Sequence, residues 1–129
     1  HDALAANRRG RIINIVSLGS FVALKEVAVY TASKTALLGL TRNMAVDWAD
    51  HGINVNAIAP GVYRTDMNKD LLDGTDRGRE YLMRTPMKRF GSPVELVGAA
   101  VLLASDAASY LTGQSIIVDG GFLASGVNS

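Results

Sequence analysis

The chain has 129 residues, of which 48% are apolar and 19% are charged, a composition typical of a globular domain with one hydrophobic core. Its formal net charge of +1 excludes the broad basic surface typical of nucleic-acid binding, and its longest apolar stretch, residues 96–104, is too short to span a membrane. The lack of cysteine excludes disulfides and thiolate metal sites. We therefore expect a cytoplasmic protein with no metal and with no nucleic-acid or membrane partner.

The first ten residues predict the end of a helix. Residues 3–6 favour a helix, Arg8 and Arg9 are typical of a last turn, and Gly10 is predicted to stop it. The segment carries no apolar stretch long enough for a signal peptide. Because the front of this helix is not in the sequence, we expect the chain to be the carboxyl-terminal half of a longer protein.

Two buried strands and one long helix are predicted next. Residues 11–17 and 53–61 are short apolar runs without clean alternation, which is typical of strands buried on both faces of a parallel sheet. Residues 18–28 are predicted to form a loop. Residues 30–50 are predicted to form a helix that ends at Gly52.

A charged segment and a second helix follow. Charged side chains are concentrated in residues 62–91, which predicts a solvent-exposed excursion from the sheet. Ser92, Pro93 and Glu95 then form a capping-box pattern, which predicts the beginning of a helix over residues 93–104.

The order of these elements predicts the fold class. Residues 115–121 form a third strand pattern, so the chain reads strand, helix, strand, helix, strand, with right-handed crossovers on a parallel sheet. Three strands are about half of a doubly wound, Rossmann-like α/β sheet. We therefore expect residues 1–129 to form one partial domain of this fold.

Tyr30 and Lys34 lie one turn apart at the beginning of the first long helix. On a helical wheel both fall near Leu37, Leu40 and Met44, on the stripe expected to face the sheet. A helix that follows a parallel strand begins near the carboxyl edge of the sheet, where ligands bind. An ammonium about 4 Å from a phenol supplies roughly 4 kcal/mol in favour of the phenolate, which allows the phenol to exchange a proton with a carbonyl or alcohol oxygen.

Taken singly, each of these residues has a simpler structural interpretation. Tyr30 alone would be a core tyrosine, and Lys34 alone a surface lysine. Ser17 alone would be a hydroxyl that bonds the backbone at a strand end, and Thr65 alone a helix cap. Asp119 is expected to be structural, bonding a turn at the sheet edge.

Together the motifs resemble those of the short-chain dehydrogenases/reductases. Tyr30 and Lys34 match the family's Tyr-x-x-x-Lys motif, and Ser17 ends the preceding strand thirteen residues earlier, where the family keeps a catalytic serine. Residues 60–65, PGVYRT, are similar to the family's Pro-Gly-x-x-x-Thr segment, and residues 103–121 to its closing helix and strand. The resemblance covers the whole chain.

The resemblance implies an oxidoreductase that uses NAD or NADP to interconvert a secondary alcohol and a ketone. The catalytic residues would be Ser17, Tyr30 and Lys34. The residues that contact the cofactor would be Tyr30, Lys34, Pro60, Gly61, Val62 and Thr65. The family's glycine-rich phosphate turn, its catalytic asparagine and its selector between NAD and NADP have no counterpart here, so we expect the 129 residues alone to be inactive.

The resemblance also bears on the substrate. Residues 62–91 correspond to the family's substrate lid, and Arg64, Arg77, Arg79 or Arg84 could bind a carboxylated substrate. Residues 85–91 and 118–129 are most similar to sugar-acid dehydrogenases such as gluconate 5-dehydrogenase and 2-deoxygluconate 3-dehydrogenase, which predicts a sugar acid or polyol. The alternatives are an activity like that of 3-oxoacyl-(acyl carrier protein) reductase, or a non-catalytic truncated member that only associates.

An oligomer is expected from the helix surfaces. Ala32, Gly39 and Val46 form a stripe opposite Tyr30, and the helix over residues 93–104 is apolar nearly all round. A monomer would leave an apolar patch exposed. Because the family assembles through such helices, a homodimer or homotetramer is predicted.

Overall fold

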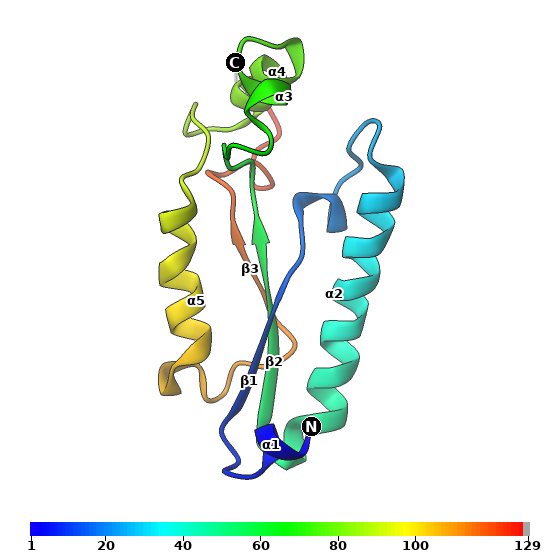
Figure 1. Cartoon of the computed structure of the whole chain (residues 1–129), viewed down its shortest axis with the longest axis vertical. Helices are drawn as coiled ribbons and strands as arrows, with labels where there is room; N and C mark the ends of the chain where they lie inside the picture. Colours follow the sequence, from blue (N-terminus) through cyan, green and yellow to red (C-terminus); the bar gives the residue numbers. More distant parts are fainter. Residues whose placement is uncertain (128–129) are drawn as a thin grey trace.

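The computed structural model describes residues 1–127; Asn128 and Ser129, the end of the tail compared above, lie outside the described residues. Three parallel strands form a sheet in the order β1 (Gly10–Ile15), β2 (Ile53–Pro60) and β3 (Ser115–Val118). Figure 1 shows one long helix on each face of this sheet. The predicted α/β class and its three parallel strands are therefore confirmed.

The central strand carries most of the core. Ile53, Val55 and Ile58 of β2 are fully buried, because strands pair with β2 on both edges and helices cover both of its faces. This double burial explains why the sequence of β2 does not alternate. The polar side chain of Asn56 is also buried, and it donates to the Leu111 carbonyl at 2.8 Å.

The helix on one face is α2 (Ala28–Trp48), followed by the 3-10 turn η2 (Ala49–His51). Gly52 caps this segment in the left-handed conformation with φ 73°, as the sequence predicted. The buried stripe of α2 differs slightly from the expected one. Its buried residues are Leu38, Thr41 and Ala45, whereas Leu40 is 50% exposed.

The cause of that shift is a polar contact. The Asn14 amide in β1 donates to the Thr41 hydroxyl at 2.9 Å, and this hydroxyl donates to the Leu37 carbonyl at 2.8 Å. Thr41 is fully buried by this arrangement. An apolar wheel does not include such a residue, so the predicted stripe was centred about one residue too early.

The amino-terminal segment corrects one expectation. Helix α1 (Asp2–Ala5) ends well before Gly10, which is the first residue of β1 rather than the stop of a helix. A Cβ atom on Gly10 would lie 2.8 Å from the Leu4 carbonyl oxygen. Glycine is therefore needed here for the close approach of α1 to the strand.

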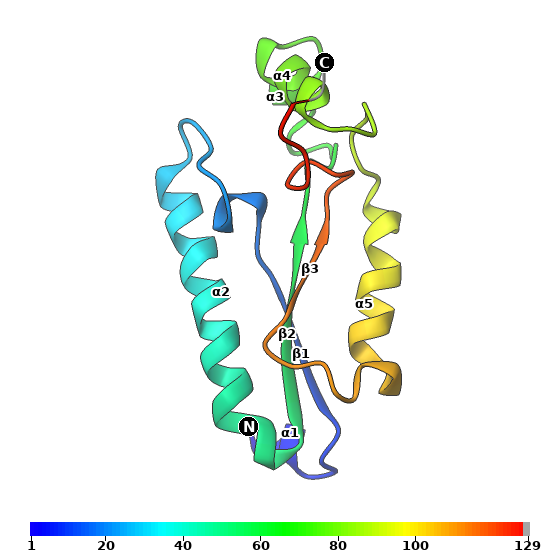
Figure 2. The same cartoon turned by 180° about the vertical axis from the view of Figure 1, so that it is seen from behind.

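The charged segment, residues 62–91, leaves the sheet at its carboxyl edge. It contains two short helices, α3 (Lys69–Leu72) and α4 (Asp76–Arg84). Figure 2 shows both at the end of the molecule towards which β2 and β3 point. The predicted excursion is thus present, and it stands beside the edge at which parallel sheets bind ligands.

The second face of the sheet is covered by η3 (Pro93–Leu96) and α5 (Val97–Ala104), and the short turn η4 (Asp106–Ala108) follows. The predicted capping box is confirmed, since the Glu95 carboxylate accepts the Ser92 N–H at 2.8 Å. No helix within residues 1–127 is long and apolar enough to cross a membrane.

The outer surface of this second layer is apolar. Leu103 of α5 is buried, but the valine side chains at 94, 97 and 101 are exposed. The exposed valines form the apolar patch that the all-round apolar sequence of this helix predicted for a single chain. In the described chain the outer side is open to solvent.

Candidate active site

Ser17 lies just after the carboxyl end of β1 and begins the 3-10 turn η1 (Leu18–Ser20). Its hydroxyl oxygen accepts the Gly19 N–H at 3.1 Å, and the residue is 8% exposed. The oxygen is therefore fixed as an acceptor, while its own proton has no acceptor among residues 1–127. Ser17 can donate a hydrogen bond to an oxygen that enters the site.

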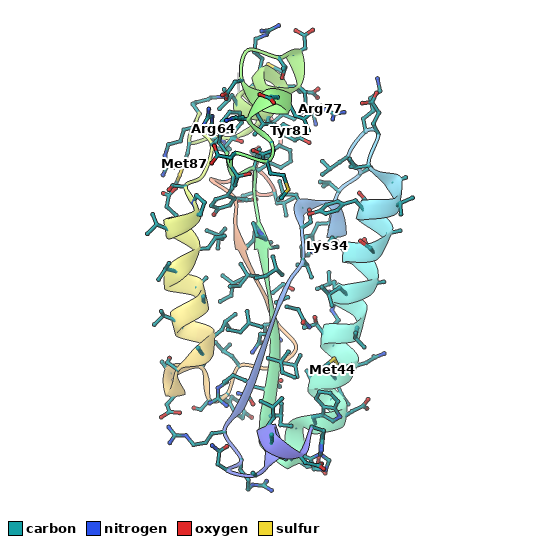
Figure 3. The ribbon with its side chains drawn as sticks, in the orientation of Figure 1. Lys34, Met44, Arg64, Arg77, Tyr81 and Met87 are labelled. Carbon is teal, nitrogen blue, oxygen red and sulfur yellow. The ribbon has the colours of Figure 1, made fainter. Side chains whose placement is uncertain are left out.

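Lys34 reaches from α2 to the same edge of the sheet. Its Nζ donates to the Ile15 carbonyl at 2.8 Å, two residues before Ser17, and lies 5.7 Å from the centre of the Tyr30 ring. Figure 3 shows Lys34 on the upper part of α2, beside the end of β1. An ammonium has three N–H donors, so the bond to Ile15 leaves two for other partners.

Tyr30 occupies the first turn of α2 and is 48% exposed. Its hydroxyl makes no hydrogen bond to the described residues, and its ring is not enclosed in the core. The phenol and the ammonium are neighbours, as the i, i+4 spacing predicted. The end of β1 and the first turns of α2 therefore bring Ser17, Tyr30 and Lys34 to the carboxyl edge of the sheet.

The predicted cofactor turn follows β2. Gly61 donates to the Val118 carbonyl at 2.8 Å, and a Cβ atom on Gly61 would lie 2.5 Å from the Asp119 Cα. Only glycine allows the ends of β2 and β3 to approach this closely. The packing of the two strand ends therefore requires glycine at position 61, whether or not a ligand binds there.

Two polar groups of this turn are free to form hydrogen bonds with a ligand. Within residues 1–127, neither the Val62 N–H nor the Thr65 hydroxyl has a hydrogen-bond partner. The Thr65 N–H, by contrast, is accepted by the Asn68 side chain at 2.8 Å. One backbone donor and one hydroxyl beside the carboxyl edge of β2 are thus available to a ligand such as an amide.

Asp119 organises the segment after β3. Its two carboxylate oxygens accept the N–H groups of Gly121 and Leu123, each at 2.8 Å. The expected structural role of Asp119 at the sheet edge is therefore confirmed. Through these bonds it fixes residues 121–123 next to the lid segment.

A cleft of about 400 Å³ opens between helix α4, the loop before α2 and the segment after β3. Its floor includes Tyr81 and Phe122, whose tilted rings are 6.3 Å apart. Residues 22–25 form one wall, and this loop connects Ser17 to Tyr30 along the chain. The candidate catalytic residues Ser17, Tyr30 and Lys34 do not themselves line the cleft; the loop that forms this wall connects them along the chain.

The four arginines considered from the sequence separate into two pairs. Arg77 and Arg84 line the cleft. Arg64 and Arg79 do not, and each forms an ion pair with an aspartate of the lid segment. The Arg64 guanidinium hydrogen-bonds the Asp73 carboxylate, with one bond of 2.8 Å, and lowers the pKa of that carboxyl.

A smaller cavity of about 220 Å³ lies on the other side of the turn after β2. The Tyr63 hydroxyl donates to the Val118 carbonyl at 2.9 Å, and burial raises the pKa of Tyr63. Hydrogen bonds from Arg89 and from the Ser92 N–H lower the pKa of Glu95 to about 2. These contacts attach the lid segment to the sheet, and no group there was predicted to be catalytic.

Comparison with known families identifies the family of the chain. A family model described as enoyl-(acyl carrier protein) reductase matches residues 2–123. The chain belongs to this family of short-chain dehydrogenases/reductases, as its motifs predicted.

Individual relatives are similar in sequence and in structure. The chain is 51% identical over 115 residues to a 2-dehydro-3-deoxy-D-gluconate 5-dehydrogenase of Dickeya dadantii. The matched residues are 89% of this chain and 46% of that protein. It is 44% identical over 117 residues to the gluconate 5-dehydrogenase of Gluconobacter oxydans, covering 91% of this chain and 46% of that protein.

A crystal structure extends the similarity to three dimensions. The gluconate 5-dehydrogenase of Burkholderia cenocepacia, in complex with NADP and tartrate, superimposes with a TM-score of 0.91 at 40% identity. The match covers 96% of this chain and 49% of that one. The chain thus spans about half the length of the relatives it matches.

Proposed function

We propose that the complete protein is an NAD(P)-dependent oxidoreductase that interconverts a secondary alcohol and a ketone on a sugar acid or a related polyol. The observation that carries this proposal is the position of Lys34, whose Nζ donates to the Ile15 carbonyl at 2.8 Å, two residues before Ser17, and lies 5.7 Å from the centre of the Tyr30 ring. Sugar-acid names among the relatives support the choice of substrate.

Each side chain has a separate task in the proposed mechanism. Tyr30 exchanges a proton with the substrate oxygen, which is possible because its hydroxyl is exposed and unbonded within the described chain. Lys34 places a positive charge beside the phenol, with its Nζ 5.7 Å from the centre of the Tyr30 ring. Ser17 donates a hydrogen bond to the same oxygen, where negative charge develops. The nicotinamide, when bound, supplies or accepts the hydride.

The residues of this chain fit the nicotinamide end of the cofactor. Lys34 has two N–H donors available for ribose hydroxyls, and the Val62 N–H and Thr65 hydroxyl are unpaired within residues 1–127, so they suit a carboxamide. We assign Pro60 and Gly61 to the wall of the same site. The pyrophosphate has no glycine-rich turn among these 129 residues.

We also propose a substrate lid, an oligomeric assembly and a cellular location for the complete protein. Residues 62–91 are the substrate lid of one partial domain, because they stand above the carboxyl edge and line the cleft. The exposed stripe of Ala32, Gly39 and Val46 and the exposed valines of η3 and α5 suit a homodimer or homotetramer. A cytoplasmic location follows from the cofactor and the cysteine-free sequence.

The test is a turnover assay with the complete gene product. Gluconate, 5-ketogluconate and 2-dehydro-3-deoxygluconate are each offered with NAD and NADP in the appropriate redox state, and the nicotinamide absorbance is followed. Turnover of a sugar acid supports the proposal. A protein that reduces only 3-oxoacyl thioesters would favour the alternative reductase activity, and one that binds neither cofactor would be the non-catalytic associating member.

A further inference from the structure

One cation in the wall of the cleft has unused hydrogen-bonding capacity. Arg77 lies in the first turn of α4, lines the cleft, and has 34% of its side chain exposed. Its Nη2 donates to the Glu26 carboxylate at 2.5 Å and contacts the Lys25 carbonyl at 3.4 Å. A guanidinium has five N–H donors, and those on Nε and Nη1 make no bond to residues 1–127.

The partner of Arg77 comes from a distant part of the chain. Glu26 precedes Tyr30 by four residues, and its backbone lies in the left-handed region with φ 68°. For a residue other than glycine this conformation is uncommon and is held by its surroundings. The ion pair connects the lid helix to the loop that leads into α2, and Figure 3 shows Arg77 on that side of α4.

The other cations near the cleft are less suited to holding an anion in one place. Lys25 lines it but is strongly exposed, and its ammonium is 4.0 Å from the Glu26 carboxylate. Arg84 lines it as well, and its Nη2 is 2.9 Å from the Glu80 carboxylate on the same helix. Among these three cations, Arg77 is held by a residue from another part of the chain through one nitrogen, and its Nε and Nη1 N–H groups make no bond to residues 1–127.

We propose that Arg77 binds the carboxylate of the sugar-acid substrate through these N–H groups and thereby selects acids over neutral polyols. This inference rests on the function proposed above. Glu26 is a positioning residue, because it holds the guanidinium at the cleft wall without touching substrate. A sugar acid carries its carboxylate and its reacting carbon at separate positions, so the proposal requires Arg77 to bind one end of the substrate while Ser17 and Tyr30 contact the other. An N–H of a guanidinium that is already held in place forms a charge-assisted hydrogen bond with a carboxylate oxygen.

The experiment compares D-gluconate with sorbitol, a neutral polyol of the same carbon number. Arg77→Gln in the complete protein is expected to raise the KM for gluconate at least tenfold, about 1.4 kcal/mol, with less than a twofold change for sorbitol and little change in kcat. Arg77→Lys should recover only part of this loss. Arg79→Gln is the matched control, because Arg79 is on the same helix, pairs with Asp76 and does not line the cleft.

A binding measurement separates this inference from the proposed function. Gluconate should raise the Tm of wild type and Arg79→Gln, and should raise that of Arg77→Gln much less, whether or not the protein turns it over. Circular dichroism confirms that each variant is folded. Equal increases in KM for gluconate and sorbitol, or a full gluconate-induced Tm shift in Arg77→Gln, would overturn the role of Arg77 in carboxylate binding. The ion pair between Arg77 and Glu26 would then have only a structural role. If wild type turns over no sugar acid, but the gluconate-induced increase in Tm is lost in Arg77→Gln, the carboxylate site is supported and the proposed reaction is contradicted.

Discussion

Removal of the Asp119 carboxylate should loosen the wall of the cleft. Asp119 accepts two backbone N–H groups at 2.8 Å each, and these bonds hold the segment that carries Phe122 and Leu123. A hydrogen bond to a charged group contributes about 1.5–3 kcal/mol, and water replaces part of it at a half-exposed site. Working from the lower part of that range, we expect Asp119→Ala to reduce the free energy of unfolding by about 2–4 kcal/mol.

The assay is urea unfolding of the complete protein followed by circular dichroism, together with the KM for gluconate. Asp119→Asn keeps one oxygen acceptor and should lose about half as much stability. Asp47→Ala is the control, because Asp47 is exposed on α2 and makes no bond or ion pair to the described residues. The reasoning would be refuted if Asp119→Ala unfolded at the same urea concentration as wild type, or if Asp47→Ala lost as much.

Two further predictions concern the same edge of the sheet. Gly61→Ala places a methyl group 2.5 Å from the Asp119 Cα, so it should lower the free energy of unfolding by about 1–3 kcal/mol. Gly126→Ala is the control and should lower it by almost nothing, because the space around the Gly126 Cα is open. Equal urea midpoints for the two variants would contradict this account. The lowered pKa of Glu95, about 2, means that its bonds to Arg89 and Ser92 stabilise the fold above its ordinary pKa of about 4.3 and lose that effect as pH falls towards 2. Glu95→Gln should therefore show a shallower fall of Tm than wild type between pH 4.5 and 2, and parallel curves would show that Glu95 does not contribute.

The sequence predicted the architecture because local signals and burial agree. β2 is mostly apolar, interrupted only by two asparagines, and is the central, doubly covered strand. Ser92 and Glu95 carried the capping pattern, and the bond between them is formed. Tyr30 and Lys34 are brought together by helix geometry alone, so their proximity could be predicted from a spacing of four.

What the sequence could not predict depends on long-range pairing of polar groups. The contact between Asn14 and Thr41 crosses from strand to helix and rotates the buried stripe of α2, yet neither residue contributes to an apolar pattern. The partner of Arg77 is 51 residues away, in a loop without periodicity. Four arginines in one charged segment look equivalent in sequence, and only their positions in the fold separate the two that line the cleft from the two that do not.

The central claim is that the phenol of Tyr30, beside the Lys34 ammonium, transfers the proton of the reaction. The most direct measurement is kcat for Tyr30→Phe in the complete protein, together with the dissociation constant for NAD(P)H, because removal of one hydroxyl leaves the packing of the ring intact. General acid–base catalysis contributes about 10²–10⁴-fold, so kcat should fall by at least a hundredfold while cofactor affinity changes less than about threefold. Turnover by Tyr30→Phe at the wild-type rate would contradict the account.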